Sequence, residues 1–324
     1  MKPRRIDLEA PQTAEHTALG IPPLEVSVTH PGAHPFRRDL LLLVGLPLLA
    51  LAGWALGHWL LPAGWQPVVD QVARSLGAEA FWLAAGVGLF AQVVDGALGM
   101  AYGITATTFL LSTGVPPAAA SASVHMAEIF TTGFSGLSHW RFGNVDKALF
   151  KRLLFPGIVG VVLGAYVVTS IDGKALKPWI SAYLVGMGLY VLSKAFRKIE
   201  RRKEPPRHVA ALAVTGGFVD SVGGGGWGPV VTTSLIGTGN DPRTTIGSVN
   251  AAEFFLSIAG GVSFAILIGF TYWEVIAGLV VGGLFAAPFA AWLCHHLQAR
   301  TLLILVGVLI TFISSFNLWR ALAG

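Results

Sequence analysis

One motif occurs twice in the chain, and this duplication constrains the fold more than any other feature of the sequence. Residues 94–103 read VDGALGMAYG, and residues 219–228 read VDSVGGGGWG, with the two aspartates 125 positions apart (220 − 95). The register continues without a gap through Thr107 and Thr232, Thr113 and Thr238, Pro117 and Pro242, Ser123 and Ser248, and Glu128 and Glu253. A repeat of this length indicates two copies of one structural unit.

The composition places both copies in a membrane. Charged residues make up 12% of the chain and hydrophobic residues 53%, whereas charged residues make up about 25% of a soluble domain. Apolar runs long enough for a helix to cross a bilayer, about 20 residues, occur at 39–62, 80–111, 116–139, 149–170, 176–196, 209–236, 243–268, 273–295 and 301–319. The sequence therefore predicts an all-α polytopic membrane protein.

Charge and cysteine content exclude other classes of protein. The net charge is +5, but the basic residues cluster beside apolar runs, as at 194–203, which is typical of cytoplasmic loops rather than of nucleic-acid binding. The single cysteine, Cys294, excludes an internal disulfide and a cysteine-based metal or redox motif. We expect the lipid bilayer as a partner, no nucleic acid, no cofactor and no metal site.

The apolar runs divide the chain into five parts. These are a disordered cytoplasmic tail at 1–38, an accessory transmembrane helix at 39–62, repeat A at 79–197, a basic cytoplasmic linker at 198–208 and repeat B at 209–321. The tail is polar and without apolar periodicity, which favours disorder. The run at 39–62 has no counterpart in the second half, so it is accessory to the repeat.

The distribution of basic residues predicts how the repeats cross the membrane. With the linker inside, the other basic loops fall inside only if 80–111 and its counterpart 209–236 enter and return as two half-helices. The run 80–111 is also too long for a single untilted crossing. Each repeat then has an odd number of crossings, so the two repeats have inverted topology, and the N-terminus is cytoplasmic.

The glycine-rich breaks are the first candidate binding site. Irregular backbone at membrane depth is tolerated where it is buried in protein or lines a cavity, and the helix after each break would point free N–H groups at an anion. The candidate substrate-binding residues here are Gly99, Tyr102, Gly103, Gly224, Gly225, Gly226 and Trp227. Two alternatives stay open: the glycines pack helices, and Asp95 and Asp220 act as N-caps of the second half-helices.

Two glutamates form the second candidate. Glu128 and Glu253 lie inside apolar runs, where a carboxylate costs roughly 2.5–3.5 kcal/mol, so we expect them to be protonated and able to carry a proton. His125 precedes Glu128 by three residues and faces the same side of a helix. Ser123, Ser248 and Asn250 lie nearby as further substrate-binding candidates, and Asp95 and Asp220 join the proton-coupling set. The alternative is a structural polar cluster between helices.

These motifs resemble the TauE/SafE-type sulfite exporters, also called the TSUP family, over nearly all of 80–320. The resemblance rests on the duplicated glycine-rich break followed by Thr-Gly-x-x-Pro, and residues 223–229 match the family pattern well. The first copy departs, with Met100 and Ala101 in place of glycines and Ile104 in place of a proline. The resemblance implies a carrier in the bacterial inner membrane that exports sulfite, sulfoacetate or related organosulfonates.

Together these features predict a secondary transporter of small sulfur-containing anions that works by alternating access with protons as the coupling ion. The alternatives are a passive anion channel, an uptake permease for another small anion and, less favoured, an intramembrane enzyme. An enzyme would need a nucleophile or metal constellation, and the sequence contains neither Gly-x-Ser-x-Gly nor His-Glu-x-x-His. We therefore predict no catalytic residues.

Overall fold

The computed structural model describes most of the two repeats. It covers residues 66–98, 100–141, 143–196, 208–238, 240–269, 272–296 and 299–323, together with two short strands, β1 (Arg5–Ile6) and β2 (Glu25–Val26), which pair antiparallel. The rest of the predicted tail, the accessory helix at 39–62 and nearly all of the linker at 198–208 lie outside the described residues.

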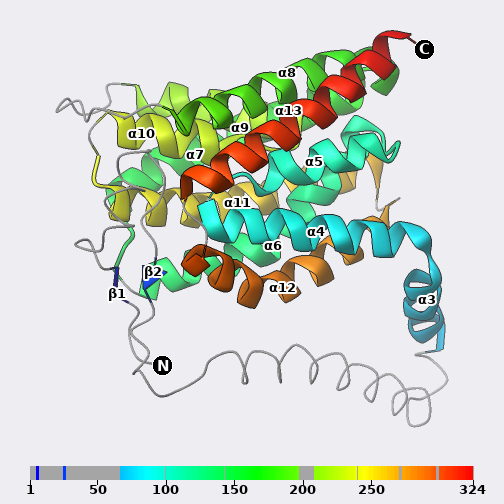
Figure 1. Cartoon of the computed structure of the whole chain (residues 1–324), viewed down its shortest axis with the longest axis horizontal. Coiled ribbons are helices and arrows are strands. Elements are labelled where there is room, and N and C mark those ends of the chain that lie inside the picture. Colours follow the sequence, from blue (N-terminus) through cyan, green and yellow to red (C-terminus); the bar gives the residue numbers. More distant parts are fainter. Residues whose placement is uncertain are drawn as a thin grey trace.

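Helices form nearly all of the described chain, which confirms the all-α prediction (Figure 1). The first half contains α3 (Gln66–Gly77), α4 (Glu79–Leu98), α5 (Tyr102–Ser112), α6 (Pro117–Arg141), α7 (Lys147–Ser170) and α8 (Gly173–Lys194). The second half contains α9 (Val209–Gly223), the π-helix η2 (Gly228–Thr232), α10 (Thr233–Gly237), α11 (Pro242–Ile268), α12 (Trp273–His296) and α13 (Ala299–Ala323). From α4 and from α9 onward, the two halves follow the same order of elements.

Several of these helices are long and apolar enough to cross a membrane. Four meet both conditions among the described residues: Lys147–Ser170, Gly173–Lys194, Arg243–Ile268 and Arg300–Ala323. A fifth arises if the pair Asp70–Gly77 and Glu79–Asp95, bent by 73°, is taken as one broken span. The structure is therefore that of a multi-pass membrane protein. Its amphipathic helix α3 was not predicted from the sequence, because its apolar residues do not form a continuous run.

Aspartates fix where several of the long helices begin. Asp146 accepts hydrogen bonds from the backbone N–H groups of Ala148 and Leu149 at the start of α7. Asp172 and Asp241 occupy the same capping position before α8 and α11. These carboxylates satisfy N–H groups that the helix itself leaves unpaired, so the helix starts are defined locally by the sequence.

Helices of each half pack against helices of the other half. α4 of the first half packs along α12 of the second, and α9 of the second half packs along α7 of the first. Glycines allow both contacts, since a Cβ on Gly282 would collide with the carbonyl oxygen of Ala85, and a Cβ on Gly160 with that of Val214. α6 pairs with α11, and α8 with α13. Each half therefore depends on the other for its core.

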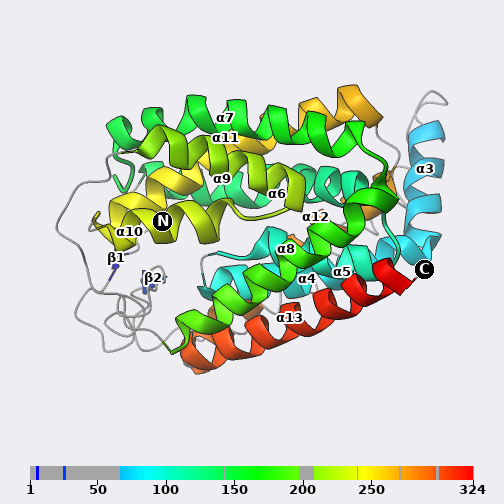
Figure 2. The ribbon, with the colours of Figure 1, turned by 90° about the horizontal axis from the view of Figure 1, so that it is seen from above.

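The two broken helix pairs enter the molecule from opposite ends. In Figures 1 and 2, α4 and α5 run back along one another, and their outer ends lie at the end of the molecule where α3 stands. The outer ends of α9 and α10 lie at the opposite end. The connections within both pairs consequently lie inside the helix bundle, where they face one another.

Candidate functional site

The break in each helix pair is closed by the aspartate of the repeated motif. Asp95 Oδ1 accepts a hydrogen bond of 3.2 Å from the backbone N–H of Tyr102, and Asp220 Oδ1 accepts one of 3.0 Å from that of Trp227. Both bonds span seven residues, so the carboxylate reaches across the break to the first turn of the next helix. Ala101 and Trp227 occupy the N-cap positions, so each aspartate bonds to the start of the next helix from the end of the preceding one, in the same way in both repeats.

The second break is held in a conformation that only glycine adopts easily. Gly224, Gly225 and Gly226 have φ values of 64°, 154° and 155°, in the region that L residues with a side chain rarely occupy. A Cβ on Gly224 would also collide with Thr107 Oγ1, and a Cβ on Gly225 with the backbone nitrogen of Ile104. The glycine run therefore serves both the turn and a close approach to α5.

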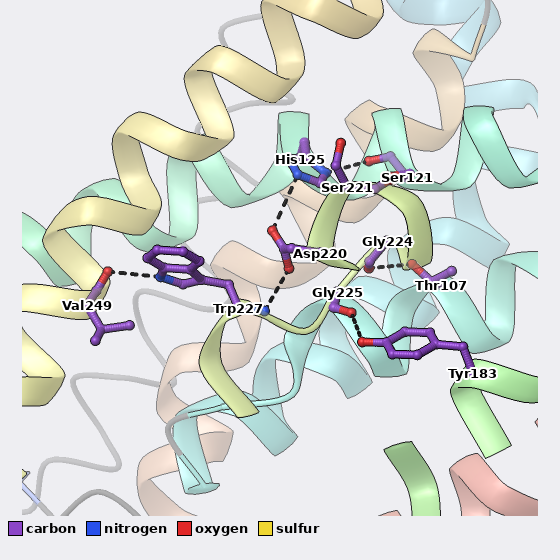
Figure 3. Close-up of polar contacts among 10 residues, drawn as sticks. All are labelled: Thr107, Ser121, His125, Tyr183, Asp220, Ser221, Gly224, Gly225, Trp227 and Val249. Atoms are coloured by element: carbon purple, nitrogen blue, oxygen red, sulfur yellow. Dashed lines mark hydrogen bonds and ion pairs between the residues drawn. The ribbon is translucent and has the colours of Figure 1, made fainter. Parts of the chain in front are cut away.

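The two breaks are in direct contact. A Cβ on Gly103 would lie 2.6 Å from Gly225 Cα, so the backbones of the two repeats touch without a side chain between them. Thr107 Oγ1 donates to the carbonyl oxygen of Gly224 at 2.6 Å, and Tyr183 Oη donates to that of Gly225 at 2.8 Å (Figure 3). These bonds satisfy two carbonyl groups that the broken helix leaves free.

A histidine of the first repeat pairs with the aspartate of the second. His125, which is 1% exposed, places Nε2 3.4 Å from Asp220 Oδ2 (Figure 3). Its Nδ1 lies 3.0 Å from the carbonyl oxygen of Ser121, and a carbonyl only accepts, so Nδ1 carries a proton. Nε2 makes no hydrogen bond among the described residues, so its contact with Asp220 is an ion pair only when Nε2 is protonated as well.

Glu128 lies where the two breaks meet. Its side chain is buried, and Oε1 would be 3.1 Å from a Cβ on Gly103. Oε2 has no hydrogen-bond partner among the described residues. Asp95, Asp220 and Glu253 lie near enough to act on it electrostatically. Glu128 is therefore at the contact between the breaks, and carboxylates from equivalent positions of both repeats lie near it.

The other predicted residues at the breaks are buried in different ways. Trp227 is fully buried in the core, and its Nε1 donates to the carbonyl oxygen of Val249 at 3.3 Å (Figure 3). Tyr102 and Ser123 are buried, and neither hydroxyl has a hydrogen-bond partner in the described part of the chain. Buried hydroxyls normally have one, so these two are candidates for a ligand. Gly99 lies outside the described residues.

Two of the predicted residues on α11 make their polar contacts elsewhere. Ser248 Oγ accepts from the backbone N–H of Asp146 at 2.9 Å and donates to the carbonyl oxygen of Thr244 at 2.6 Å. Asn250 Nδ2 donates to Ser135 Oγ at 3.0 Å. Both side chains therefore tie α11 to the first half. Glu253, one turn further, is half-buried and belongs to the carboxylate cluster.

Three residues at the breaks were missed in the sequence. Thr107 and Tyr183 hold the second break, and Lys194 joins the first break to the helix that follows the second. Lys194 is 3% exposed, and its Nζ lies 2.5 Å from Thr233 Oγ1 and 3.2 Å from Met100 Sδ. The sequence does contain a signal for Lys194, because it lies inside the apolar run 176–196 as well as at the start of the basic cluster 194–203. Placing a lysine inside such a run costs free energy, which favours a specific role.

An apolar groove lies apart from this polar centre. It has a volume of about 750 Å³ and is lined mainly by Phe130, Trp140, Phe150, Phe254 and Phe255, on α6, α7 and α11. Several of these rings are exposed, and on a membrane protein such a face meets lipid tails. The groove offers no charged group to a substrate, so the polar breaks remain the candidate site.

A multi-pass helical protein whose two discontinuous helices meet in a buried polar centre has the architecture of a membrane transporter. The model of the sulfite exporter TauE/SafE family matches residues 84–316, and the chain belongs to this family. It is 41% identical over 247 residues, 72% of its own length and 82% of the relative's, to the "Probable membrane transporter protein YtnM" of Bacillus subtilis (strain 168). No solved structure matches the chain significantly.

Proposed function

We propose that this transporter moves small sulfur-containing anions, such as sulfite, sulfoacetate or related organosulfonates, out of the cell across the bacterial inner membrane, coupled to protons. The observation that carries the proposal is the cluster of Asp95, Glu128, Asp220 and Glu253 around the contact between the breaks, with His125 paired to Asp220. The family description supports sulfite as the first anion to test.

The carboxylates determine the sign of the coupling. An ionised carboxylate accepts hydrogen bonds only and repels an anion, whereas a protonated one donates a hydrogen bond. The anion therefore binds when the cluster holds protons, and anion and proton move in the same direction. When a singly charged anion leaves with one proton, the charges cancel and the membrane potential does not act on the step, so export proceeds when the outward anion gradient exceeds any inward proton gradient.

Alternating access requires a binding site that lies between two parts of the protein that move relative to one another. The two helix pairs enter from opposite ends of the molecule, and Gly103 and Gly225 touch between them. We propose that the repeats have inverted topology and that rocking of one against the other opens this contact to each side in turn. Glycine backbones suit such a contact because no side chains have to be unpacked as they separate.

The test is flux into liposomes that contain the purified protein. Radiolabelled sulfite or sulfoacetate should enter faster when the outside is more acidic than the inside, and slower when the gradient is reversed. Glu128→Gln and Glu253→Gln should each remove this dependence, since an amide carries no exchangeable charge. Lys174→Gln, at an exposed position of α8, is the matched control.

Two outcomes would contradict the proposal. Flux that ignores the gradient and persists in both glutamine variants would indicate a passive anion channel. Absence of flux for sulfite, sulfoacetate and other organosulfonates, with protein that is folded and inserted, would exclude this class of substrate.

A further inference from the structure

A lysine at the C-terminal end of α8 is buried between the first break and the helix that follows the second. Lys194 Nζ donates to Thr233 Oγ1, on the helix after the second break, and lies beside Met100 Sδ, in the first break. The ring of Tyr190, one turn earlier, has its centroid 4.9 Å from the same Nζ. The ammonium therefore occupies a point where side chains from both repeats converge.

The charge of this ammonium has no partner of opposite sign in the described part of the chain. No described carboxylate lies within 4 Å of Nζ, and its neighbours are a hydroxyl, a weakly accepting thioether and an aromatic ring. An ammonium has three N–H donors, and a buried charge is normally paired. Lys194 thus has a donor left over, and its protonated form has no counter-charge among the described residues.

Because Asp95 and Asp220 occupy the N–H groups at the two helix starts, an anion bound at the breaks needs the positive charge of Lys194. The N–H groups of Tyr102 and Trp227, which the sequence assigned to an anion, donate instead to Asp95 and Asp220. When these carboxylates are ionised, they also add negative charge at both helix starts. The attraction for an anion must then come from a cation, and His125 is already engaged with Asp220.

We propose that Lys194 is the anion-binding residue of the transporter. Its ammonium binds one oxygen of a small sulfur oxyanion, and the Thr233 hydroxyl, which now accepts from Nζ, donates a second hydrogen bond. Met100 packs against the apolar side of the ligand. This proposal rests on the proposed function and names the residue that recognises its substrate.

The other repeat does not reproduce this arrangement. Trp319 occupies the position equivalent to Lys194 and is 63% exposed. Thr108 is the counterpart of Thr233, and its Oγ1 lies 3.3 Å from Ser314 Oγ. Its carbonyl oxygen accepts a hydrogen bond of 3.1 Å from Asn317 Nδ2. These partners are neutral, so among the described residues the arrangement occurs only once, between α8, the first break and the start of α10.

Lys194→Gln tests the proposal in the same liposomes. It should raise the KM for sulfite or sulfoacetate at least about tenfold, equivalent to about 1.4 kcal/mol, with a smaller change in the maximal rate. Lys194→Arg should keep most of the affinity, because it keeps the charge. Thr233→Val should raise the KM less than Lys194→Gln, and Lys174→Gln should leave it unchanged.

Direct binding to the purified protein separates this inference from the transport proposal. Sulfite and sulfoacetate should raise the unfolding temperature of the wild type and of Lys194→Arg, and should not raise that of Lys194→Gln. An unchanged KM in folded Lys194→Gln would overturn the inference and leave the transport proposal standing. Binding that depends on Lys194, in a protein that moves neither anion, would uphold the inference and reject transport. If Lys194→Gln does not fold, a Thr233→Val protein with wild-type KM overturns the inference.

Discussion

The two breaks share one capping bond and differ in almost everything around it. In both, an aspartate accepts from the backbone N–H seven residues later. The second break consists of glycines with positive φ and is held by Thr107 and Tyr183. The first contains Met100 and Ala101, and its contact is with Lys194.

This difference suggests a division of labour between the repeats. The second break carries the His125–Asp220 pair and fits closely against α5, so in the proposed transport cycle it is the part that holds and releases protons. The first break presents a thioether beside an ammonium, as expected for the part that recognises the anion. The two copies of the motif therefore share a scaffold and differ in the contacts that surround it.

Gly225→Ala should have the largest effect. A methyl group there would collide with the Ile104 nitrogen at a φ of 154°, and strain with overpacking should cost about 3 kcal/mol or more. Met100→Leu, at the equivalent position of the first break, should cost less than about 1.5 kcal/mol. Thermal unfolding in detergent measures both. Equal losses would show that the breaks are equally constrained.

Removing charge from the two aspartates should have unequal, intermediate effects. Asparagine keeps an oxygen for the capping bond, so Asp220→Asn chiefly removes the carboxylate that faces His125. We expect a fall of about tenfold or more in transport rate, which corresponds to about 1.4 kcal/mol. No described histidine lies beside Asp95, so Asp95→Asn should lower the transport rate much less. Similar rates for the two variants would assign both aspartates to capping alone.

The smallest effect concerns Ala101. Its φ of 109° is the only positive value of a non-glycine residue in the described chain, and such a conformation costs a residue with a Cβ roughly 1–2 kcal/mol. Ala101→Gly should therefore raise the stability by up to about 1 kcal/mol. Ala106→Gly, inside α5, should lower it by about the same amount. A fall in unfolding temperature for Ala101→Gly would show that the break needs the methyl group.

Local features of this fold could be predicted from the sequence. The positions of the breaks, the helices after them and the burial of Glu128 follow from glycine runs, apolar length and a carboxylate inside an apolar run. The register of the repeat also placed Asp95 and Asp220 in equivalent positions, where the structure shows equivalent bonds. Such features depend on residues close together in the chain.

Contacts between distant segments could not be predicted in this way. Which helices face one another decides the packing of α4 on α12 and of α9 on α7. It also decides the pairing of His125 with Asp220. The apolar periodicity of a helix identifies its buried face but does not show which other helix packs against that face. Ser248 and Asn250 illustrate this, since their register suggested the site and their bonds go to Asp146, Thr244 and Ser135.

The opposite orientation of the two repeats is tested most directly by labelling one equivalent position in each. Thr113→Cys and Thr238→Cys follow the second half-helix of their repeats, and both are made in a Cys294→Ala background. In sealed right-side-out vesicles, a membrane-impermeant maleimide should label Thr113→Cys and leave Thr238→Cys unlabelled, with the reverse in inside-out vesicles. Labelling of both positions from the same side would contradict the inverted arrangement and, with it, a single site shared by the two breaks.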